Sequence, residues 1–525
     1  DPLLLNATGA GSVVHLEGHI SAESLASSGP AQVSGTVNLG TGHLAFSQSL
    51  DGDASAQGNR LDIDARNGDV LIGGVVGGIQ PLDGLAIENA DDVTFSQAVT
   101  LSGDLVIHAS GIVRFDGPLD LNGGTLTIIG ASQVILGGGT IGAGVIQSDT
   151  IQVLGAMQGG SLQLHGNDPA QTINLGGSDM AGACNISATS LANLAGLSGL
   201  VIGERGADGH TAAGAGDVHI AAIDLSGFIN SIDIHGNRIT VENNPNGSLL
   251  LGNGLNLEAL GDIRVEDSVA TAHGDMSLVS LGGDITMTAG SRLVGQGDSI
   301  ELRAEGNLVL GGVDAQGSQV NPAGRVVLQT LGGQILDADQ DAAVNVRGEE
   351  VLMRGLGAGQ GQNALEVDAS RIGIAAGGGV VYQDVTPEGN VHYMLMRGGL
   401  VYEQMVSLGD AVRVTDTTDP RGDDLAGGPV DAIPPSAQAA AAGMFSSLWS
   451  SGVMATVASA HTADYLSTYS GAVTLDQGDG LLSDQSYGLG GGYTLLGSPG
   501  MQTWSTGEAA NDEEAFEYWI ESLAL

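Results

Sequence analysis

The chain alternates apolar and polar residues in short runs of four to six, from about Ser12 to about Val414. Runs such as RLDIDA, DLVIHA, TLTIIG and SLQLHG are separated by Gly, Asp, Asn or Ser-Gly. Alternation with a period of two places one set of side chains in a core and the other set in solvent, which is typical of β-strands. The pattern therefore predicts an all-β protein whose strands are joined by tight turns.

The alternating runs repeat with a longer period. One series of strand starts carries Gly261-Asp262, Gly283-Asp284 and Gly306-Asn307, whose glycines recur at an almost constant spacing. A second, offset series carries Gly274-Asp275 and Gly297-Asp298 at the same spacing. Two interleaved series with one period indicate at least two strands and two turns in each repeat. We therefore predict a parallel β-solenoid of roughly eighteen coils, each stacked about 4.8 Å above the last.

Glycine and aspartate fit the turns of such a coil. The chain has 87 glycines, and glycine adopts positive φ without a Cβ clash at sharp corners. The Gly-Asp pairs are therefore interpreted as turn residues. Calcium binding by these carboxylates is the alternative left open, although the tandem G-G-x-G-x-D-x-U-x calcium repeat is not present. No other cofactor is expected.

Composition divides the chain into three parts. Residues 1–415 are predicted to form the solenoid. Residues 416–443 carry four prolines and many small residues, and they are predicted to be a linker or extended arm. Residues 444–525 are richer in aromatic side chains: before Tyr382 the chain has four aromatic residues, all of them phenylalanine. This last part is predicted to cap the solenoid or to dock on another subunit, with one or two short helices.

Two segments of the last part have a helical pattern. The segment MFSSLWSSGVMATV places Phe445, Trp449 and Val457 on one helical stripe, with a strand as the alternative. The segment NDEEAFEYWIESLAL has a plausible N-cap at Asn511 and an apolar face at i, i+3, i+4 and i+7. These faces cover either the end of their own solenoid or a neighbouring molecule. The residues predicted to make this subunit contact are Phe445, Trp449, Phe516, Trp519, Ile520 and Leu523.

Charge restricts the partners. The formal net charge is -45, and all 15 basic residues are arginine. Such a surface repels nucleic acid and anionic membranes, which need basic patches. No apolar run is long enough to span a membrane, and the opening residues DPLLLN are expected to be those of a mature form without its leader. The one cysteine, Cys184, excludes an intrachain disulfide and is interpreted as a small buried apolar residue.

A search for chemistry favours a protein without enzymatic activity. Many parallel β-helices act on polysaccharides through clustered carboxylates, a basic residue and aromatic platforms. Asp62, Asp64 and Asp69 do cluster, but no Lys, Tyr or Trp occurs before Tyr382. The eleven histidines have no metal-binding spacing, and HExxH, CxxC, GxSxG and P-loop motifs are absent from the sequence.

Two stretches resemble the repeats of a known family. They are LSGDLVIHASGIVRFDGPLDLNGGTLTIIGASQVILGGG and SLGGDITMTAGSRLVGQGDSIELRAEGNLVLGGV. They resemble filamentous haemagglutinin-like proteins, and still more the giant LEPR-XLL-tagged surface adhesins of Gram-negative bacteria. In that family a Ser-Ala-Asp-Pro stretch typically follows the tag, and the start Asp1-Pro2-Leu3 resembles the sequence left by a cut within that stretch. The resemblance implies a right-handed parallel β-solenoid, export to the cell surface or matrix, and a structural or adhesive role.

These observations lead to one functional prediction and two alternatives. We expect a structural subunit of an extracellular bacterial fibre or biofilm matrix, which forms a homopolymer through its solenoid ends and its C-terminal segment. The first alternative is a monomeric surface adhesin that binds cell-surface or matrix components and whose C-terminal part caps its own rod. The second is a polysaccharide lyase or hydrolase built on a β-helix.

Overall fold

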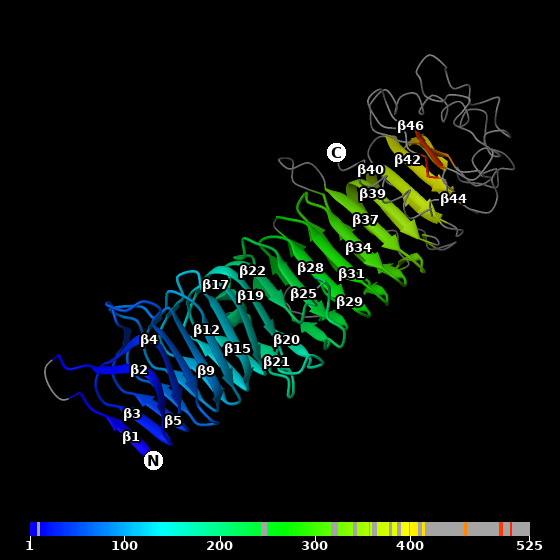
Figure 1. The fold of residues 1–525 in the computed structure, drawn as a ribbon. Helices are drawn as coiled ribbons and strands as arrows, with labels where there is room; N and C mark the ends of the chain where they lie inside the picture. Colours follow the sequence, from blue (N-terminus) through cyan, green and yellow to red (C-terminus); the bar gives the residue numbers. More distant parts are fainter. Residues whose placement is uncertain are drawn as a thin grey trace. The chain divides into compact units, whose positions relative to one another are not determined.

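The computed structural model describes two compact units, Asp1–Asp275 and Met276–Leu525 (Figure 1). Described residues are 1–369, apart from 8–10, 207, 222, 243–248, 272, 317–323, 340–343, 356–357 and 360–364. Beyond them only the backbones of strands are described, namely 370–376, 381–385, 390–397, 400–407, 412–414, 456–458, 493–496 and 505–506. The fold is a parallel β-solenoid of about 15 turns, with 56% strand and 1% helix.

The coils of the first unit build one continuous parallel sheet from a single strand of each coil. Strands that are neighbours in this sheet come from successive coils, so Val93 lies opposite Val113 of the next coil. In sheet order the strands are β1 (Pro2–Leu5), β3 (Ser24–Ser27), β5 (His43–Phe46), β8 (Val70–Ile72), β10 (Val93–Phe95), β13 (Ile112–Phe115), β16 (Gln133–Leu136), β18 (Thr150–Val153), β21 (Cys184–Ile186), β20 (Ile173–Leu175), β23 (Val218–Ile220), β26 (Ile239–Val241) and β29 (Ile263–Val265).

A second column of longer strands stacks in the same way. It contains β2 (Val14–Ser21), β4 (Ala31–Gly40), β7 (Arg60–Asp64), β9 (Gly84–Ala90), β12 (Leu105–Ala109), β15 (Thr125–Ala131), β17 (Gly139–Ser148), β19 (Met157–His165), β22 (Gly196–Ile202), β25 (Ile232–Gly236) and β28 (Leu255–Ala259). Short strands of a third face are β6 (Leu50–Gly52), β11 (Val99–Thr100), β14 (Leu119–Asp120), β24 (Asp224–Leu225), β27 (Leu249–Leu251) and β30 (Val269–Thr271). The long strand β4 pairs with both β6 and β7, so it covers two faces at once.

The second unit is also built from parallel strands, and its last strands pair antiparallel. Parallel strands are β31 (Met276–Ser280), β32 (Ile285–Met287), β33 (Arg292–Gly295), β34 (Ile300–Ala304), β35 (Leu308–Leu310), β36 (Gly312–Asp314), β37 (Arg325–Thr330), β38 (Ile335–Asp337), β39 (Val346–Gly355), β40 (Leu365–Ala376) and β42 (Asn390–Arg397). Strand β43 (Leu400–Ser407) pairs antiparallel with β42, and β44 (Val412–Val414) pairs antiparallel with β41 (Val381–Val385). Antiparallel pairing therefore replaces parallel pairing among these last strands of the sheet.

The sequence predicted the solenoid correctly but overestimated the number of coils. A uniform period gave roughly eighteen, whereas coil length varies along the chain. Val134 lies opposite Ile151, whereas Thr150 lies opposite Asn185, which is a much longer step along the sequence. The long coil contains an excursion in which β21 is inserted between β18 and β20, although β20 comes first along the chain.

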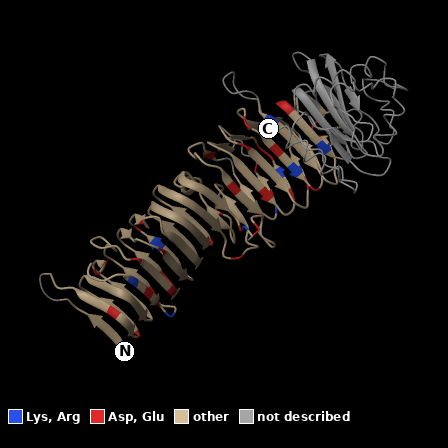
Figure 2. Ribbon diagram, turned by 45° about the horizontal axis from the view of Figure 1, so that its top comes forward, with Lys and Arg blue, Asp and Glu red and all other residues tan. Residues whose placement is uncertain are grey.

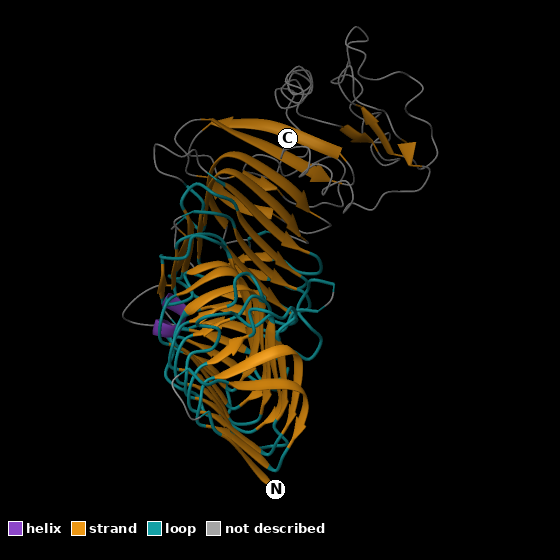
Figure 3. Ribbon diagram, turned by 60° about the vertical axis from the view of Figure 1, so that its left-hand side comes forward, coloured by secondary structure: helices purple, strands orange, loops and turns teal. Residues whose placement is uncertain are grey.

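One short helix, α1 (Ala188–Ala192), follows β21 and was not predicted (Figure 3). The Ser187 hydroxyl caps it by accepting from the Ser190 N–H at 3.1 Å. In the predicted C-terminal helices, Val457 lies in strand β45 (Thr456–Ala458), which pairs antiparallel with β46 (Tyr493–Leu496); β46 in turn pairs with β47 (Ser505–Thr506). The strand alternative therefore holds at Val457, while Phe445, Trp449 and 511–525 lie outside the described residues.

Inward-facing residues form continuous columns along the stack. Phe46 lies opposite Ile72, which lies opposite Phe95, which lies opposite Phe115. The rings of Phe95 and Phe115 are 4.7 Å apart with an interplanar angle of 8°. All four side chains are fully buried, so three of the four phenylalanines of the predicted solenoid form one apolar column.

Carboxylates at the turns connect successive coils. The side chain of Asp92 accepts from the Ile112 N–H at 2.7 Å, Asp104 accepts from Thr125 at 2.8 Å, and Asp284 accepts from Asn307 at 2.6 Å. Each bond satisfies a backbone donor of the next coil, as predicted for turn residues. In the part of the chain that is described, no three acidic, histidine or cysteine side chains are grouped in a way that could hold a metal ion.

Replacing Phe95 with alanine should leave a cavity in the phenylalanine column. We expect Phe95→Ala to lower the free energy of unfolding by about 3–5 kcal/mol. The control is Thr94→Ala on the same strand, whose half-buried side chain faces away from the column and should change stability by less than about 0.5 kcal/mol. Guanidinium unfolding followed by circular dichroism measures both variants, and equal losses for the two would contradict the column.

Cys184 should be unreactive in the folded protein. Its side chain is fully buried, and burial, with a smaller contribution from Asp149, raises the pKa of the thiol to about 12. Because the thiolate is the reactive species, we expect a thiol reagent such as 5,5′-dithiobis(2-nitrobenzoic acid) to modify it only after unfolding in guanidinium. Rapid modification of the native protein would show that β21, which carries Cys184, separates from β18 and β20 in the folded protein.

Candidate functional site

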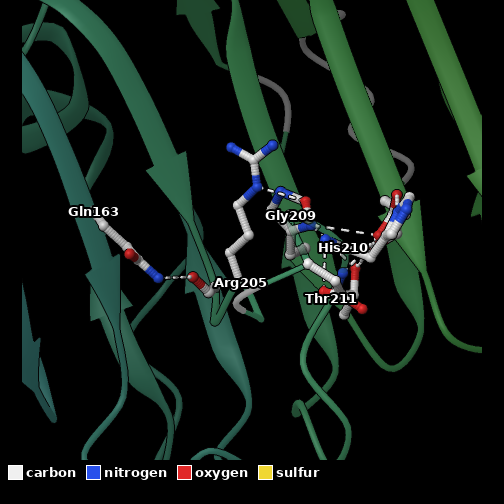
Figure 4. Close-up of polar contacts among 9 residues, drawn as sticks. Gln163, Arg205, Gly209, His210 and Thr211 are labelled. Carbon is white, nitrogen blue, oxygen red and sulfur yellow. Dashed lines mark hydrogen bonds and ion pairs between the residues drawn. The ribbon is translucent and has the colours of Figure 1, made fainter.

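A polar hairpin leaves the solenoid between β22 and β23. Residues 203–217 make this excursion, and the Glu204 carbonyl accepts from the Ala212 N–H at 3.0 Å to close the hairpin. Gly203 begins it with φ +93, and a Cβ there would lie 2.0 Å from the carbonyl oxygen of His235. Gln163 on β19 donates to the Gly203 carbonyl at 3.1 Å (Figure 4). The departure point therefore requires glycine and is held by the neighbouring strand.

Beneath the hairpin lie two titratable side chains on adjacent strands. His235 on β25 and Glu258 on β28 occupy the same register position. Each follows an inward-facing residue, Ile234 or Leu257, so each points to the outer face of the sheet. Outer-face residues are normally solvated, but His235 is only 2% exposed and Glu258 only 7%, because His210 and Thr211 of the hairpin contact them.

Glu258 accepts most of the bonds that hold the hairpin. Its Oε1 accepts from the Thr211 N–H at 2.6 Å and from the Thr211 hydroxyl at 3.0 Å, and its Oε2 contacts His210 Nδ1 at 3.0 Å. Thr211 Oγ1 also lies 2.9 Å from the Glu258 carbonyl oxygen and 3.0 Å from His235 Nδ1. One carboxylate thus docks the hairpin against the sheet.

The pKa values of the two histidines in the cluster are shifted in opposite directions. Hydrogen bonding to Glu258 raises the pKa of His210, which lies at the exposed edge. Burial lowers the pKa of His235, and this effect exceeds the attraction of Glu258. Burial also acts to raise the pKa of Glu258, but hydrogen bonds from His210 and Thr211 outweigh it and hold that pKa below its usual value. At neutral pH the cluster is therefore a carboxylate beside a neutral buried imidazole.

The cluster contains the groups used in nucleophilic catalysis, namely a hydroxyl, an imidazole and a carboxylate within hydrogen-bonding distance. Thr211 is only 6% exposed, so an external substrate does not reach its hydroxyl. Within the described residues, His235 Nε2 is buried without a hydrogen-bond partner.

Sequence reasoning did not single out this cluster. His235 and Glu258 are one coil apart, at the same place in the strands IDIHG and LNLEA. Two polar residues at equivalent positions of successive coils could have indicated the His235–Glu258 pair from the sequence. Nothing in the repeat pattern indicates that Thr211 joins them, because the hairpin that carries Thr211 interrupts the repeat.

The docking residues and clustered carboxylates that were noted from the sequence are not part of this cluster. All six predicted docking residues (Phe445, Trp449, Phe516, Trp519, Ile520 and Leu523) lie outside the described residues. Among the clustered carboxylates, Asp62 Oδ1 pairs with Arg60 Nε at 2.8 Å, Asp64 accepts from Asn89 at 3.1 Å, and Asp69 lies 3.6 Å from His43. These contacts lie within or between coils, and Figure 2 shows charged residues scattered along the strands rather than gathered.

A second candidate is the first strand pair of the described stack. Among the described residues, strand β1 pairs with β3, and β2 pairs with β4. Leu3 and Leu5 share a column with the buried Leu25 and Ser27, yet both are only half-buried. Within the described residues, the outer side of β1 has no strand beside it, and part of the apolar core there is only half-buried.

No family model, curated protein or solved structure matches this chain. No helix among the described residues is long and apolar enough to cross a membrane.

Removing the charge of Glu258 should undock the hairpin. Glu258→Gln replaces an acceptor of charge-assisted bonds with a neutral amide, and we expect it to lower stability by about 1–3 kcal/mol. Glu17→Gln, at an exposed position of β2, is the matched control and should have almost no effect. Hydrogen exchange of residues 204–212 measures the docking, and unchanged protection in Glu258→Gln would show that the carboxylate does not hold the hairpin.

The two histidines should give the hairpin an optimum pH. In the folded protein the pKa of His235 lies below its ordinary value of 6.5. The contribution of neutral His235 to stability is therefore lost as the pH falls below about 6.5. In the folded protein the pKa of His210 lies above that ordinary value. The contribution of protonated His210 to stability is therefore complete below pH 6.5 and is lost as the pH rises through the raised pKa.

Hydrogen-exchange protection of 204–212, corrected for intrinsic exchange, should therefore peak near neutrality and fall on both sides. His210→Gln should remove the alkaline loss alone, and His235→Asn the acidic loss alone. A flat profile in the unmodified protein would contradict both assignments.

Proposed function

We propose that this protein is a structural subunit of an extracellular fibre or biofilm matrix of a Gram-negative bacterium. In this proposal a second copy of the chain stacks on β1 and β2, the first strands of the described stack. The observation that carries it is the half-buried pair Leu3 and Leu5 on β1, which among the described strands pairs with β3 alone. A further coil placed there would complete both the hydrogen-bond ladder and the apolar column.

The sides of the solenoid support the same proposal. Outward residues on the described strands are mostly small or polar, and the acidic ones are used in contacts such as Arg114–Asp116 at 2.6 Å and Arg238–Asp217 at 2.6 Å. The net charge of -45 opposes lateral association. Growth at the ends is therefore favoured over clumping of the sides, which leads to filaments.

Location outside the cell is proposed on the family resemblance and the acidic composition. The resemblance to filamentous haemagglutinin-like repeats implies export. A surface without lysine and with 60 acidic residues stays soluble where salt screens its charge. The solenoid would then act as a rigid spacer whose coils are all held by backbone bonds.

Electron microscopy of the purified full-length chain tests the proposal. We expect filaments whose thickness is that of one solenoid. Leu3→Asp/Leu5→Asp places charges in the apolar column at the edge and should reduce filament number at least tenfold. The control is Leu4→Asp, because Leu4 is 64% exposed and lies opposite the half-buried Ala26.

Isolated rods at all concentrations would overturn the fibre and favour the monomeric surface adhesin. Filaments that are equally abundant in both aspartate variants would show that growth does not use this edge. Release of oligosaccharide from a glycan would instead favour the enzyme alternative.

A further inference from the structure

The peptide bond between His210 and Thr211 is surrounded by a hydroxyl, a carboxylate, an imidazole and a backbone N–H group. The Thr211 hydroxyl is adjacent to this bond. The carbonyl oxygen of His210, on the other side of the bond, accepts from the Gly206 N–H at 2.7 Å. A backbone N–H on a carbonyl oxygen is the arrangement that stabilises an oxyanion when that carbonyl is attacked.

One oxygen of Glu258 contacts both atoms between which a proton would have to move. Its Oε1 lies 3.0 Å from Thr211 Oγ1 and 2.6 Å from Thr211 N. In an attack of Oγ1 on the preceding carbonyl, the hydroxyl loses a proton and the amide nitrogen gains one. A carboxylate oxygen within hydrogen-bonding distance of both atoms can transfer that proton.

His235 completes the set. Its Nδ1 lies 3.0 Å from Thr211 Oγ1. With the proton on Nδ1, the imidazole donates to Oγ1 and leaves the hydroxyl proton to Glu258, whose carbonyl oxygen and Oε1 lie 2.9 Å and 3.0 Å from Oγ1. The carboxylate is then the base that activates the hydroxyl, and the imidazole holds the hydroxyl oxygen in place.

We propose that the chain cleaves itself between His210 and Thr211. Thr211 Oγ1 bonds to the His210 carbonyl carbon while its proton passes to Glu258 Oε1. The C–N bond breaks and the nitrogen takes that proton, so the peptide becomes an ester with a free amine on Thr211. Water then adds to the ester carbon, the C–Oγ1 bond breaks, and Oγ1 regains a proton. No oxidation or reduction occurs, and water is the only co-reactant.

The fold accommodates this cleavage. The side chain of His210 is 62% exposed, so the cleaved bond lies next to a solvent-facing residue that water can approach, while Thr211 and Glu258 are buried. Residues 1–210 keep β22, which pairs with β19 within that fragment and with β25 of residues 211–525. The two fragments therefore stay bound through the strand ladder. A native column would elute one species, whereas a denaturing gel would separate two.

Intact-mass spectrometry of the full-length protein, purified with protease inhibitors and held at neutral pH for several days, tests the proposal. We expect fragments 1–210 and 211–525, the second beginning Thr-Ala-Ala. Hydroxylamine cleaves esters, so it should increase the cleaved fraction several-fold and leave a hydroxamate on His210. Thr211→Ser retains a hydroxyl and should still cleave.

Three variants test the roles of these groups. Thr211→Val keeps the shape of the side chain without the hydroxyl and should abolish cleavage. Glu258→Gln should slow it at least tenfold. The matched control is Thr41→Ala, which removes another buried hydroxyl, one that donates to the His43 carbonyl at 2.9 Å, and should leave cleavage at His210 unchanged. Circular dichroism verifies that each variant keeps its strands.

Two results would overturn the proposal. An unmodified chain that stays whole for a week, with and without hydroxylamine, would mean that the cluster only docks the hairpin. Equal cleavage in the unmodified protein and in Thr211→Val would mean that the cut does not use the hydroxyl and comes from another protease.

Discussion

Parallel pairing between successive coils is the interaction on which the rest of this structure depends. The backbone N–H and C=O groups of a strand point alternately to its two neighbours, so one coil is satisfied only by the coils beside it. Register then fixes which side chains meet. Phe95 lies on Phe115, and His235 lies beside Glu258, because the ladder places equivalent positions of adjacent coils at strand spacing. Apolar columns and polar pairs are two consequences of the same stacking.

The same ladder gives the acidic residues a structural role. Where a turn leaves a backbone N–H without a strand partner, an aspartate of the preceding coil accepts its hydrogen bond, as Asp92 does for Ile112 and Asp284 for Asn307. A carboxylate accepts such bonds more strongly than a neutral group does. Part of the large negative charge is therefore spread through turn contacts rather than gathered at one site.

Departures from the regular coil are where the fold acquires individual features. The inserted β21 lengthens one coil and introduces the single described helix. The hairpin 203–217 covers outer-face positions that are solvated elsewhere and turns His235 and Glu258 into buried groups. Burial changes their chemistry, since it lowers the pKa of His235, while the new hydrogen bonds lower that of Glu258. A repetitive scaffold thus provides a specialised site only where its repetition is interrupted.

The sequence by itself determined the class of fold, the inward columns and the turn role of Asp284, because alternation and period are local and each coil repeats them. It also identified Cys184 as a buried apolar residue, since its small neighbours match an inward strand. It could not determine the number of coils, the antiparallel pairing of β42 with β43, or the insertion of β21, because these depend on which strands pair across long stretches of sequence. Nor could it bring Thr211 to Glu258: the two are far apart along the chain and are joined only by the docking of the hairpin, and that contact exists only when the stacked strands have formed its surface.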